Sequence, residues 1–464
     1  MSEGGAPTAI SAEQPEPRLG TFHKLVYGMG DHSVNLSLSA LSLLFLFFMT
    51  EVAGLRPALA GAVIWVARLF DAVSDPLIGR FSDSRTWKMG RRRPFFLIGM
   101  LPFAIAFTLL WRTPFESQGE MFVYYLGVYI FLSLSTTTLS VPYLALLPEM
   151  ARGYDERTSL NAFRSGCAVS GTLFAVGMRL TADSWGGDAE AYAAAAMIFG
   201  VWLMVPWLPV YGVSFERNDA PHQTPPPIRE GLKELFAHRN FLRLCAIYIT
   251  ARIAVDVGGG SLAYLAAAWL GRPEDFGPFL LALLCSSILS LPIWLRISRK
   301  YDKHNLFIFG AGWWGFFLIA MFLFVPPDAP RMYFMAMMGI IGFGYCAADL
   351  MPWAMIGEVI DEDELTTGQR REGVYNGFFT FIRKIAGATG VLAMGLALEF
   401  SGYINSRGLA TMPVQPESAL LTIRISATLA PAFFLAIAMA IAFRYPLTRK
   451  VHADIRRQLE ERGA

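Results

Sequence analysis

The sequence predicts an all-helical integral membrane protein, and three observations support this fold class. Hydrophobic residues make up 54% of the 464-residue chain and charged residues only 16%, whereas a soluble domain carries about a quarter of its residues as charged side chains. The apolar residues fall in long continuous runs and not in periodic stripes. These runs are longer than the strands of a membrane barrel and do not alternate between apolar and polar residues as such strands do. We therefore expect helices, in which the backbone N–H and C=O groups form hydrogen bonds to one another inside the bilayer.

Twelve apolar segments approach the length of about 20 residues that a helix needs to cross the hydrocarbon core. They lie at residues 25–50, 58–80, 95–112, 121–147, 160–182, 191–214, 240–270, 276–297, 305–325, 332–358, 373–399 and 420–443. If both termini are cytoplasmic, most lysine and arginine residues fall in the tails and inner connections, as the positive-inside rule requires. We therefore predict twelve transmembrane helices with both ends in the cytoplasm.

The chain is expected to form two six-helix halves joined by a linker. The predicted parts are a polar tail at 1–22, a first bundle at 23–214, a proline-rich cytoplasmic linker at 215–239, a second bundle at 240–444 and a C-terminal tail at 445–464. The halves resemble each other, because Pro142 closes the fourth span ahead of Glu149, and Pro352 closes the tenth span ahead of Glu358. Repeated halves are typical of transporters that expose a midplane site to each side in turn.

A pair of carboxylates in the second span is the strongest indication of a binding site in the sequence. Asp71 and Asp75 are four residues apart, so they share a helix face, with Cβ atoms about 5–6 Å apart. Like charges at membrane depth repel and lose hydration, so a proton or a cation is expected between them. Ser74 and a backbone carbonyl freed by Pro76 would add the oxygen ligands that hard cations prefer. The alternative is an Arg68–Asp71 ion pair that only holds helices together.

Other spans also contain polar residues, which indicate a binding site less strongly. The fourth span contains Ser135, Thr136, Thr137, Thr138 and Ser140. Most of these hydroxyls are expected to bond within their own helix, and one to complete the cation site. In the seventh span Arg252 and Asp256 are four residues apart, which favours an internal salt bridge over a ligand role. In the first span Asp31 and Asn35 share a face.

The connection at residues 79–94 is predicted to act as a gate as well as a topology signal. It contains Asp83, Arg91, Arg92 and Arg93. These charges would pair across the inner ends of helices when the cytoplasmic side is shut and separate when it opens. The acidic run at 361–364 would serve the second half in the same way.

Several long patterns make the resemblance to one family specific. In chain order they are YGMGDHSVN, ARLFDAVSDPLIG, GRRRP, VPYLALLPE and VIDEDELTTGQRREGVYNG leading into FIRK. The sequence resembles the glycoside–pentoside–hexuronide:cation symporters, a branch of the major facilitator superfamily, over nearly the whole chain after residue 22. This resemblance implies that Asp71 and Asp75 bind the cation, with Ser74 and Thr137 as accessory ligands. It also implies a substrate site with Arg164, Lys384 and the positions of Asn35 and Ser140. Asp31, one turn before Asn35 on the same helix face, is a further candidate for this site.

The chain departs from this family at two positions of the sugar site. Relatives of the melibiose-transporting type carry acids at the positions of Asn35 and Ser140, where this chain has an amide and a hydroxyl. An uncompensated cation at membrane depth is costly. Either Asp31 pairs with Arg164, or the substrate supplies the negative charge. The second option leads us to expect an anionic or strongly polar head group.

These features predict a secondary-active symporter for a sugar-like solute, driven by Na⁺ or H⁺, in the plasma (inner) membrane. A lysophospholipid transporter on the same fold is the alternative, and a membrane-embedded enzyme or receptor is the third reading. The four cysteines lie singly, and neither a zinc-binding HExxH pattern nor a Walker A sequence occurs. We therefore expect no enzyme activity and no cofactor besides the coupling ion. The expected partners are a small-molecule substrate, a cation and membrane lipid, with no nucleic acid, and the expected state is a monomer.

Overall fold

The computed structural model describes residues 19–83, 87–151, 154–216, 235–369, 371–407 and 413–463. Within these ranges every regular element is a helix, which confirms the all-helical fold class. The first half comprises α1 (Thr21–Ala40), the π-helical turns η1 (Leu41–Phe45) and η2 (Phe48–Val52), α2 (Pro57–Asp83), α3 (Pro94–Leu110), α4 (Gln118–Met150), α5 (Tyr154–Ser184), α6 (Ala189–Met204) and α7 (Trp207–Val213). Most of the expected N-terminal tail and linker lies outside the described residues.

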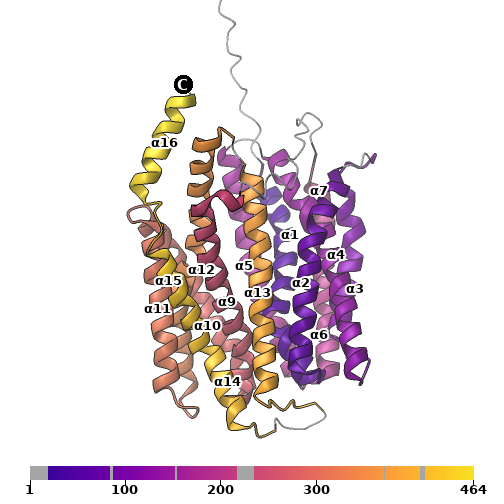
Figure 1. Ribbon diagram of the computed structural model, residues 1–464. Helices are drawn as coiled ribbons and strands as arrows, with labels where there is room; N and C mark the ends of the chain where they lie inside the picture. The colour runs from indigo at the N-terminus through magenta and orange to yellow at the C-terminus, as the bar shows by residue number, and fades with distance from the viewer. Residues whose placement is uncertain are drawn as a thin grey trace, which may run out of the picture.

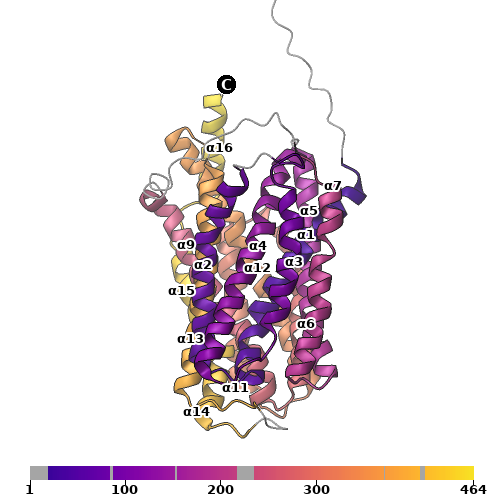
Figure 2. The ribbon, with the colours of Figure 1, turned by 90° about the vertical axis from the view of Figure 1, so that its right-hand side faces the viewer.

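The second half repeats this helical architecture. It comprises α9 (Arg239–Tyr264), η3 (Leu265–Trp269), η4 (Pro273–Asp275), α10 (Phe276–Ser298), α11 (Lys303–Phe324), α12 (Arg331–Thr367), α13 (Glu372–Phe400), α14 (Glu417–Ala427), α15 (Leu429–Ala442) and the terminal helix α16 (Arg449–Gly463). Figure 1 shows the two halves side by side, with their helices running along a common direction. The start of α1 and the whole of α16 lie at one end of the bundle, here named the terminal end (Figures 1 and 2). The other end, where α14 begins, is named the opposite end.

Each of the twelve predicted segments coincides with a helix or with consecutive helical pieces. In the described part of the chain, eight helices are long and apolar enough to cross a membrane by length and composition. Of the other predicted spans, α3 is apolar but only 17 residues long. The segments built on α1, α5 and α9 contain charged residues such as Asp31, Arg164 and Arg252. Helices that line a polar cavity carry such residues, and these three segments are not among the eight.

Two prolines that were expected to end spans lie inside helices. Pro142 is inside α4, which continues to Met150, and Pro352 is inside α12, which continues to Thr367. A proline removes one backbone donor, and packing against neighbouring helices allows a transmembrane helix to continue past it. The 37 residues of α12 extend about 55 Å, more than the roughly 30 Å of the hydrocarbon core. The acidic run at 361–364 is therefore part of a helix that projects from the terminal end.

Close contact of α1 with α4 and α5 depends on glycine. A Cβ atom at Gly30 would lie 2.8 Å from the Tyr143 ring, and one at Gly28 would lie 2.8 Å from the sulfur of Cys167. At Gly171 of α5 a Cβ atom would lie 2.2 Å from the carbonyl oxygen of His32. These contacts hold the polar face of α1 close to the helices that share its site.

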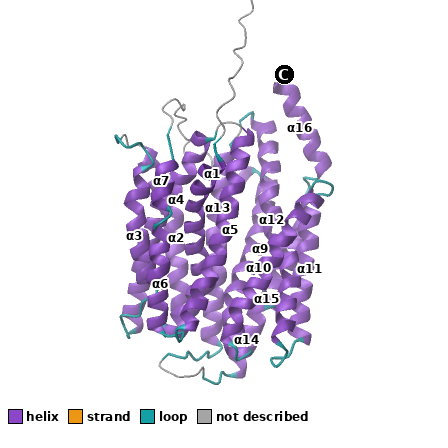
Figure 3. Cartoon of the chain, turned by 180° about the vertical axis from the view of Figure 1, so that it is seen from behind, coloured by secondary structure: helices purple, strands orange, loops and turns teal. Residues whose placement is uncertain are grey.

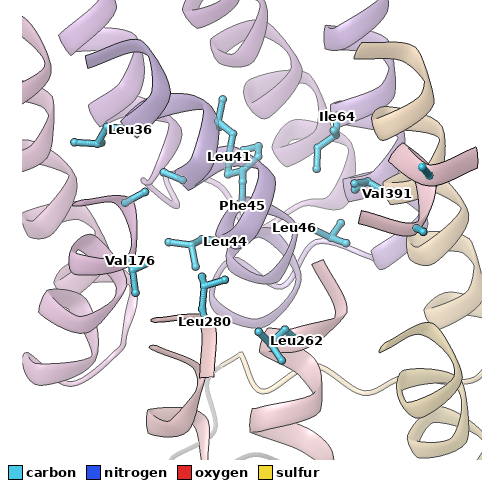
Figure 4. Close-up of a cluster of buried hydrophobic side chains, with 14 of the residues drawn as sticks. Leu36, Leu41, Leu44, Phe45, Leu46, Ile64, Val176, Leu262, Leu280 and Val391 are labelled. Atoms are coloured by element: carbon cyan, nitrogen blue, oxygen red, sulfur yellow. The ribbon is translucent and has the colours of Figure 1, made fainter. Parts of the chain in front are cut away.

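The two halves meet at the opposite end. Trp65 of α2 donates a hydrogen bond to Thr389 of α13 (3.3 Å), and Arg56 forms an ion pair with Glu399. Figure 4 shows Leu44 of the first half next to Leu280 of the second half, and Leu41, Phe45 and Leu262 are buried in the same apolar cluster. Apolar burial and polar bonds thus close the opposite end of the bundle.

Candidate functional site

A cavity of about 540 Å³ lies between the two halves. The first half lines it with polar residues from α1, α2 and α4, including Asp31, Asn35, Asp71, Asp75, Thr137 and Ser140. The second half adds Arg252, Asp256, Asp349, Arg383 and Lys384. The cavity thus joins most of the predicted cation site to most of the predicted substrate site, whereas Ser74 and Arg164 are not among the residues that line it.

Asp71 and Asp75 are brought together as predicted, and their bridging partner is Lys384 of α13. The Lys384 Nζ atom lies 2.6 Å from Asp71 Oδ2 and 2.5 Å from Asp75 Oδ2. Thr137 of α4 donates to Asp75 Oδ1 at 2.8 Å and lies 3.2 Å from Asp71 Oδ1. Each carboxylate thus contacts an ammonium group and a hydroxyl group. An ammonium group occupies the place where the sequence predicts a cation.

Ser133 is a member of this site that the sequence reasoning missed. Its hydroxyl donates to Asp71 Oδ1 at 2.6 Å. Ser133 precedes Thr137 by one helical turn, so the i, i+4 spacing would have identified it. Ser74 lies next to the pair but donates to the backbone carbonyl of Asp71 (3.1 Å). An accessory role for Ser74 in cation binding therefore requires it to rotate.

Among the described residues, no carboxylate oxygen lies within 4.0 Å of the Arg68 guanidinium, so the ion pair considered as the alternative is not formed, although Arg68 is within electrostatic range of Asp71. Its guanidinium lies over the Tyr129 ring, 6.0 Å from the ring centroid. The carboxylate of Asp71 instead contacts Lys384 from the other half of the protein. The pair Asp71–Asp75 is thus part of a contact between the halves, which a purely structural Arg68–Asp71 pair would not provide.

Lys384 was predicted to bind substrate, and in this structure its ammonium group is held by the two carboxylates. With the side chain in that position, an acidic group of a substrate would compete with Asp71 and Asp75 for it. An Na⁺ ion between the carboxylates would compete with the ammonium group in the same way. The geometry therefore links occupancy of the cation site to the availability of Lys384.

The positive charge of Arg164 is balanced by a carboxylate of the protein itself. Its Nε atom lies 2.5 Å from Asp31 Oδ2, and its guanidinium lies 5.1 Å from the centroid of the Tyr143 ring. The side chain of Asn35 donates to the backbone carbonyl of Asp31 at 2.9 Å. Asp31 thus takes the pairing role that the sequence left open, and the argument for an anionic substrate from an unpaired Arg164 is wrong. Ser140 lines the cavity, as do Asp31 and Asn35.

The internal salt bridge predicted in the seventh span is confirmed. Arg252 Nε lies 2.7 Å from Asp256 Oδ2, and Arg252 Nη2 lies 2.5 Å from Asp256 Oδ1. Ser42 of the first half also donates to Asp256 Oδ1 at 3.1 Å. The salt bridge therefore takes part in contact between the halves as well.

The arginines of the predicted gate fasten the terminal end of the first half. Arg92 Nη1 donates to the carbonyl of Ala145 at 2.7 Å and to Glu149 Oε1 at 2.6 Å. Arg91 Nη2 also contacts Glu149 Oε1 at 2.8 Å. Arg93 donates to the carbonyl of Tyr211 at 3.0 Å. The side chain of Asp83 lies outside the described residues.

The second half contains a matching contact. Lys303 Nζ donates to the carbonyl of Ala354 at 2.6 Å and lies 3.0 Å from Glu358 Oε1. In each half, a cation thus binds a carbonyl and a glutamate four residues later near the terminal end of a long helix. We name these two contacts the helix-end clasps, Arg92–Ala145–Glu149 and Lys303–Ala354–Glu358. They confirm the likeness of the halves that Glu149 and Glu358 indicated.

The fold and this charged cavity between two similar halves define a membrane transporter. Among the described residues, no group of three or more histidine, cysteine, aspartate or glutamate side chains is placed to hold a metal ion. A cation between Asp71 and Asp75 would therefore complete its shell with hydroxyl, carbonyl or water oxygens.

Comparison with known proteins identifies the family. The chain belongs to the MFS/sugar transport protein family, whose sequence profile matches residues 26–449. It is 31% identical to an uncharacterized symporter of Synechocystis sp., with 98% of each chain covered. It is 28% identical to YagG of Escherichia coli, which is named as a glycoside/cation symporter, with 95% of each chain covered. The family confirms the resemblance stated from the sequence motifs.

A eukaryotic relative and a solved structure extend the comparison. The chain is 25% identical to the sodium-dependent lysophosphatidylcholine symporter 1-A of Danio rerio, covering 99% of this chain and 94% of the relative. The structure resembles an inward-facing, unoccupied bacterial homologue of the human lysosomal transporter Spinster, with a TM-score of 0.69 and 13% identity. That match covers 94% of this chain and 98% of the other, and it shows the major facilitator fold.

Proposed function

We propose that this protein is a secondary-active symporter that couples a sugar-like solute to Na⁺ or H⁺ by alternating access. The observation that carries the proposal is the position of the Lys384 ammonium group between Asp71 and Asp75, at a contact between the two halves. The relatives named as symporters support it.

The coupling mechanism follows from competition for the two carboxylates. When Na⁺ binds, it replaces the ammonium group of Lys384 between Asp71 and Asp75. If the coupling ion is a proton, protonation of one carboxylate weakens its attraction for Lys384. In either case Lys384 is released toward the cavity, where it binds the substrate. Cation and substrate binding then favour each other, as symport requires.

We further propose that twelve spans cross the membrane with the terminal end in the cytoplasm. The positive-inside rule supports this orientation, because the basic clasp residues Arg92 and Lys303 lie at that end. The contacts at Trp65 and Arg56 close the opposite end. On this orientation the structure is in an inward-facing state.

The two cargo classes predicted from the sequence remain the candidates, with the sugar-like solute first. The polar residues of the cavity favour a cargo with hydroxyl groups, which Asp31, Asn35 and Ser140 would bind. The apolar part of the cavity lining, which includes Leu318 and Met321, favours the second candidate, a lysophospholipid. We propose that the chain acts as a monomer, without enzyme activity, cofactor or nucleic acid.

Uptake by the purified protein in proteoliposomes tests the function. We expect a Na⁺ or pH gradient to drive accumulation of a member of a panel of glycosides, hexuronides and lysophospholipids. Asp71→Asn should abolish the response to the cation. Asp188→Asn is the matched control, because Asp188 caps α6 far from the cavity and asparagine caps helices equally well. Equal accumulation by wild type with and without the gradients would refute the proposal.

A further inference from the structure

Glu51 is a buried carboxylate of the first half that the coupling mechanism does not use. It lies in η2, directly after the predicted first span, and the residue is 3% exposed. Its Oε2 atom accepts hydrogen bonds from the backbone N–H of Ser406 (3.2 Å) and from the Ser406 hydroxyl (2.9 Å). Ser406 belongs to the connection between α13 and α14, and Figures 1 and 3 show the described part of this connection at the opposite end. Glu51 therefore takes part in the contact that closes the opposite end.

The carboxylate of Glu51 has hydrogen-bond donors but no ion-pair partner among the described residues. Arg179 of α5 acts on it only at longer range, and the Arg179 guanidinium pairs with Asp183 at 2.8 Å. The second carboxylate oxygen, Oε1, is buried and accepts no hydrogen bond from the described part of the chain. Burial without a paired cation favours the protonated form of a carboxyl group. The closed opposite end is thus a place where a proton binds.

The surroundings of Glu51 come from both halves, so they change when the halves rock. Thr50 shares a hydrogen bond of 2.6 Å with the hydroxyl of Tyr264 in α9. The Tyr403 hydroxyl, from the connection between α13 and α14, interacts with Glu51. When the opposite end opens, Thr50 and Glu51 move away from these second-half residues and water reaches the carboxylate. A hydrated glutamate has a pKa of about 4.3, so the open form holds the proton less tightly than the closed form.

Glu51 differs from the other ionisable groups on the elements packed around it. Tyrosine and arginine side chains do not change charge between pH 5 and pH 8, and a carboxylate paired with an arginine is already ionised there. These other groups are the tyrosines Tyr125, Tyr192, Tyr264 and Tyr403 and the charged residues Arg179, Asp183 and Arg407. Arg179 is on the same half as Glu51, so its influence is similar in the closed and open forms. Of this set, Glu51 is the group whose charge depends on closure.

We propose that Glu51 is a proton-binding site at the opposite end, and that the bound proton holds this end closed. The inference rests on the orientation and the alternating access proposed above. Glu51 is not among the residues that line the cavity between the halves, so this proton is distinct from the coupling ion at Asp71 and Asp75. It enters and leaves from the outer side and is not transported. An acidic exterior then favours the inward-facing state and slows the return to the outward-facing state.

The size of the effect follows from the difference in proton affinity between the two forms. Burial raises the pKa of Glu51 to about 7 in the closed form, and in the open form the pKa is about 4.3. The proton therefore stabilises the closed form fully below about pH 4, and this stabilisation is lost as the pH rises to about 7. Between pH 5.5 and pH 8 the ratio of closed to open molecules should fall about 30-fold.

Two spin labels across the opposite end measure this ratio. Glu190→Cys in α6 and Met332→Cys in α12, both at exposed positions, carry the labels in a full-length protein whose four native cysteines are replaced by alanine. The protein is held in nanodiscs without Na⁺, substrate or a gradient. We expect the short-distance population to decrease from pH 5.5 to pH 8. Glu51→Gln keeps an oxygen acceptor for Ser406 without the charge and should stay closed at every pH. Glu274→Gln, an exposed glutamate of η4, is the matched control and should respond as the labelled parent does.

A second measurement needs no labels and decides if the cysteine-free protein does not fold. Tyr264 is fully buried in the closed form, so its oxidation by hydroxyl radicals should increase with pH in wild type and not in Glu51→Gln. A closed-to-open ratio that is constant from pH 5.5 to pH 8, or a pH response that Glu51→Gln retains in full, overturns the proton site. Both measurements are made without transport. A response that depends on Glu51, together with absent cation-driven uptake, would therefore refute symport and leave the proton site standing, and the reverse pair of results would refute the proton site alone.

Discussion

Removal of the Lys384 ammonium group should strengthen Na⁺ binding. Asp71 Oδ2 and Asp75 Oδ2 lie 2.6 and 2.5 Å from the same nitrogen atom, so they are no more than about 5 Å apart. In Lys384→Ala the two charges face each other without a cation. At an effective dielectric constant of about 20 their repulsion is about 3 kcal/mol. Because Na⁺ relieves this repulsion and no ammonium group competes, its affinity should increase by up to about 100-fold.

The measurement is Na⁺-dependent thermal stabilisation of the purified variant at neutral pH, with choline replacing Na⁺ as the reference ion. Lys300→Ala is the control, since Lys300 is an exposed lysine at the terminal end, and its Na⁺ affinity should equal that of wild type. Lowering the pH should weaken the response of Lys384→Ala, because a proton relieves the same repulsion. Unchanged or weaker Na⁺ affinity in Lys384→Ala would refute the competition between the ammonium group and the cation.

Three further changes test other parts of the structure. Asp71→Asn should abolish Na⁺-induced stabilisation while leaving the protein folded in the membrane; stabilisation equal to wild type would remove Asp71 from the site. Arg92→Gln breaks the clasp to Glu149 within the first half, so the thermal stability of the protein should fall while labelling from the two membrane sides stays close to wild type; changed labelling at unchanged stability would contradict a clasp that stays closed through the cycle. Gly171→Ala places a Cβ atom 2.2 Å from the carbonyl oxygen of His32 and should lower the free energy of unfolding by about 1–3 kcal/mol. Wild-type stability in that variant would contradict the close packing of α1 and α5.

The parts of the structure that depend on local spacing were predictable from the sequence. The apolar runs identified the helices because segment length reports on bilayer thickness. The Arg252–Asp256 salt bridge and the shared face of Asp71 and Asp75 follow from i, i+4 geometry. Ser133 lies four residues before Thr137, so the same geometry could have predicted its place in the site. Helix ends were less predictable, because packing overrides the tendency of a proline such as Pro142 to end a helix.

The parts that depend on contacts between residues far apart in the chain were not predictable. Lys384 and Asp75 are 309 positions apart in the chain, and no spacing rule links residues at that separation. The same holds for Arg164 and Asp31, which are 133 positions apart. The sequence showed that Arg164 needs a counter-charge and left two sources open. Only the arrangement of α1 beside α5 decides between them.

The helix-end clasps determine which distances in the molecule can change. Arg92 is fastened to Glu149 within the first half, and Lys303 to Glu358 within the second, so neither clasp has to break when one half rocks against the other. Each half then behaves as a rigid body, and the rocking motion is felt at contacts such as Lys384–Asp75. Spin labels placed within one half would report a constant separation throughout the transport cycle. A pair that spans the halves at the terminal end would report the full amplitude of the motion.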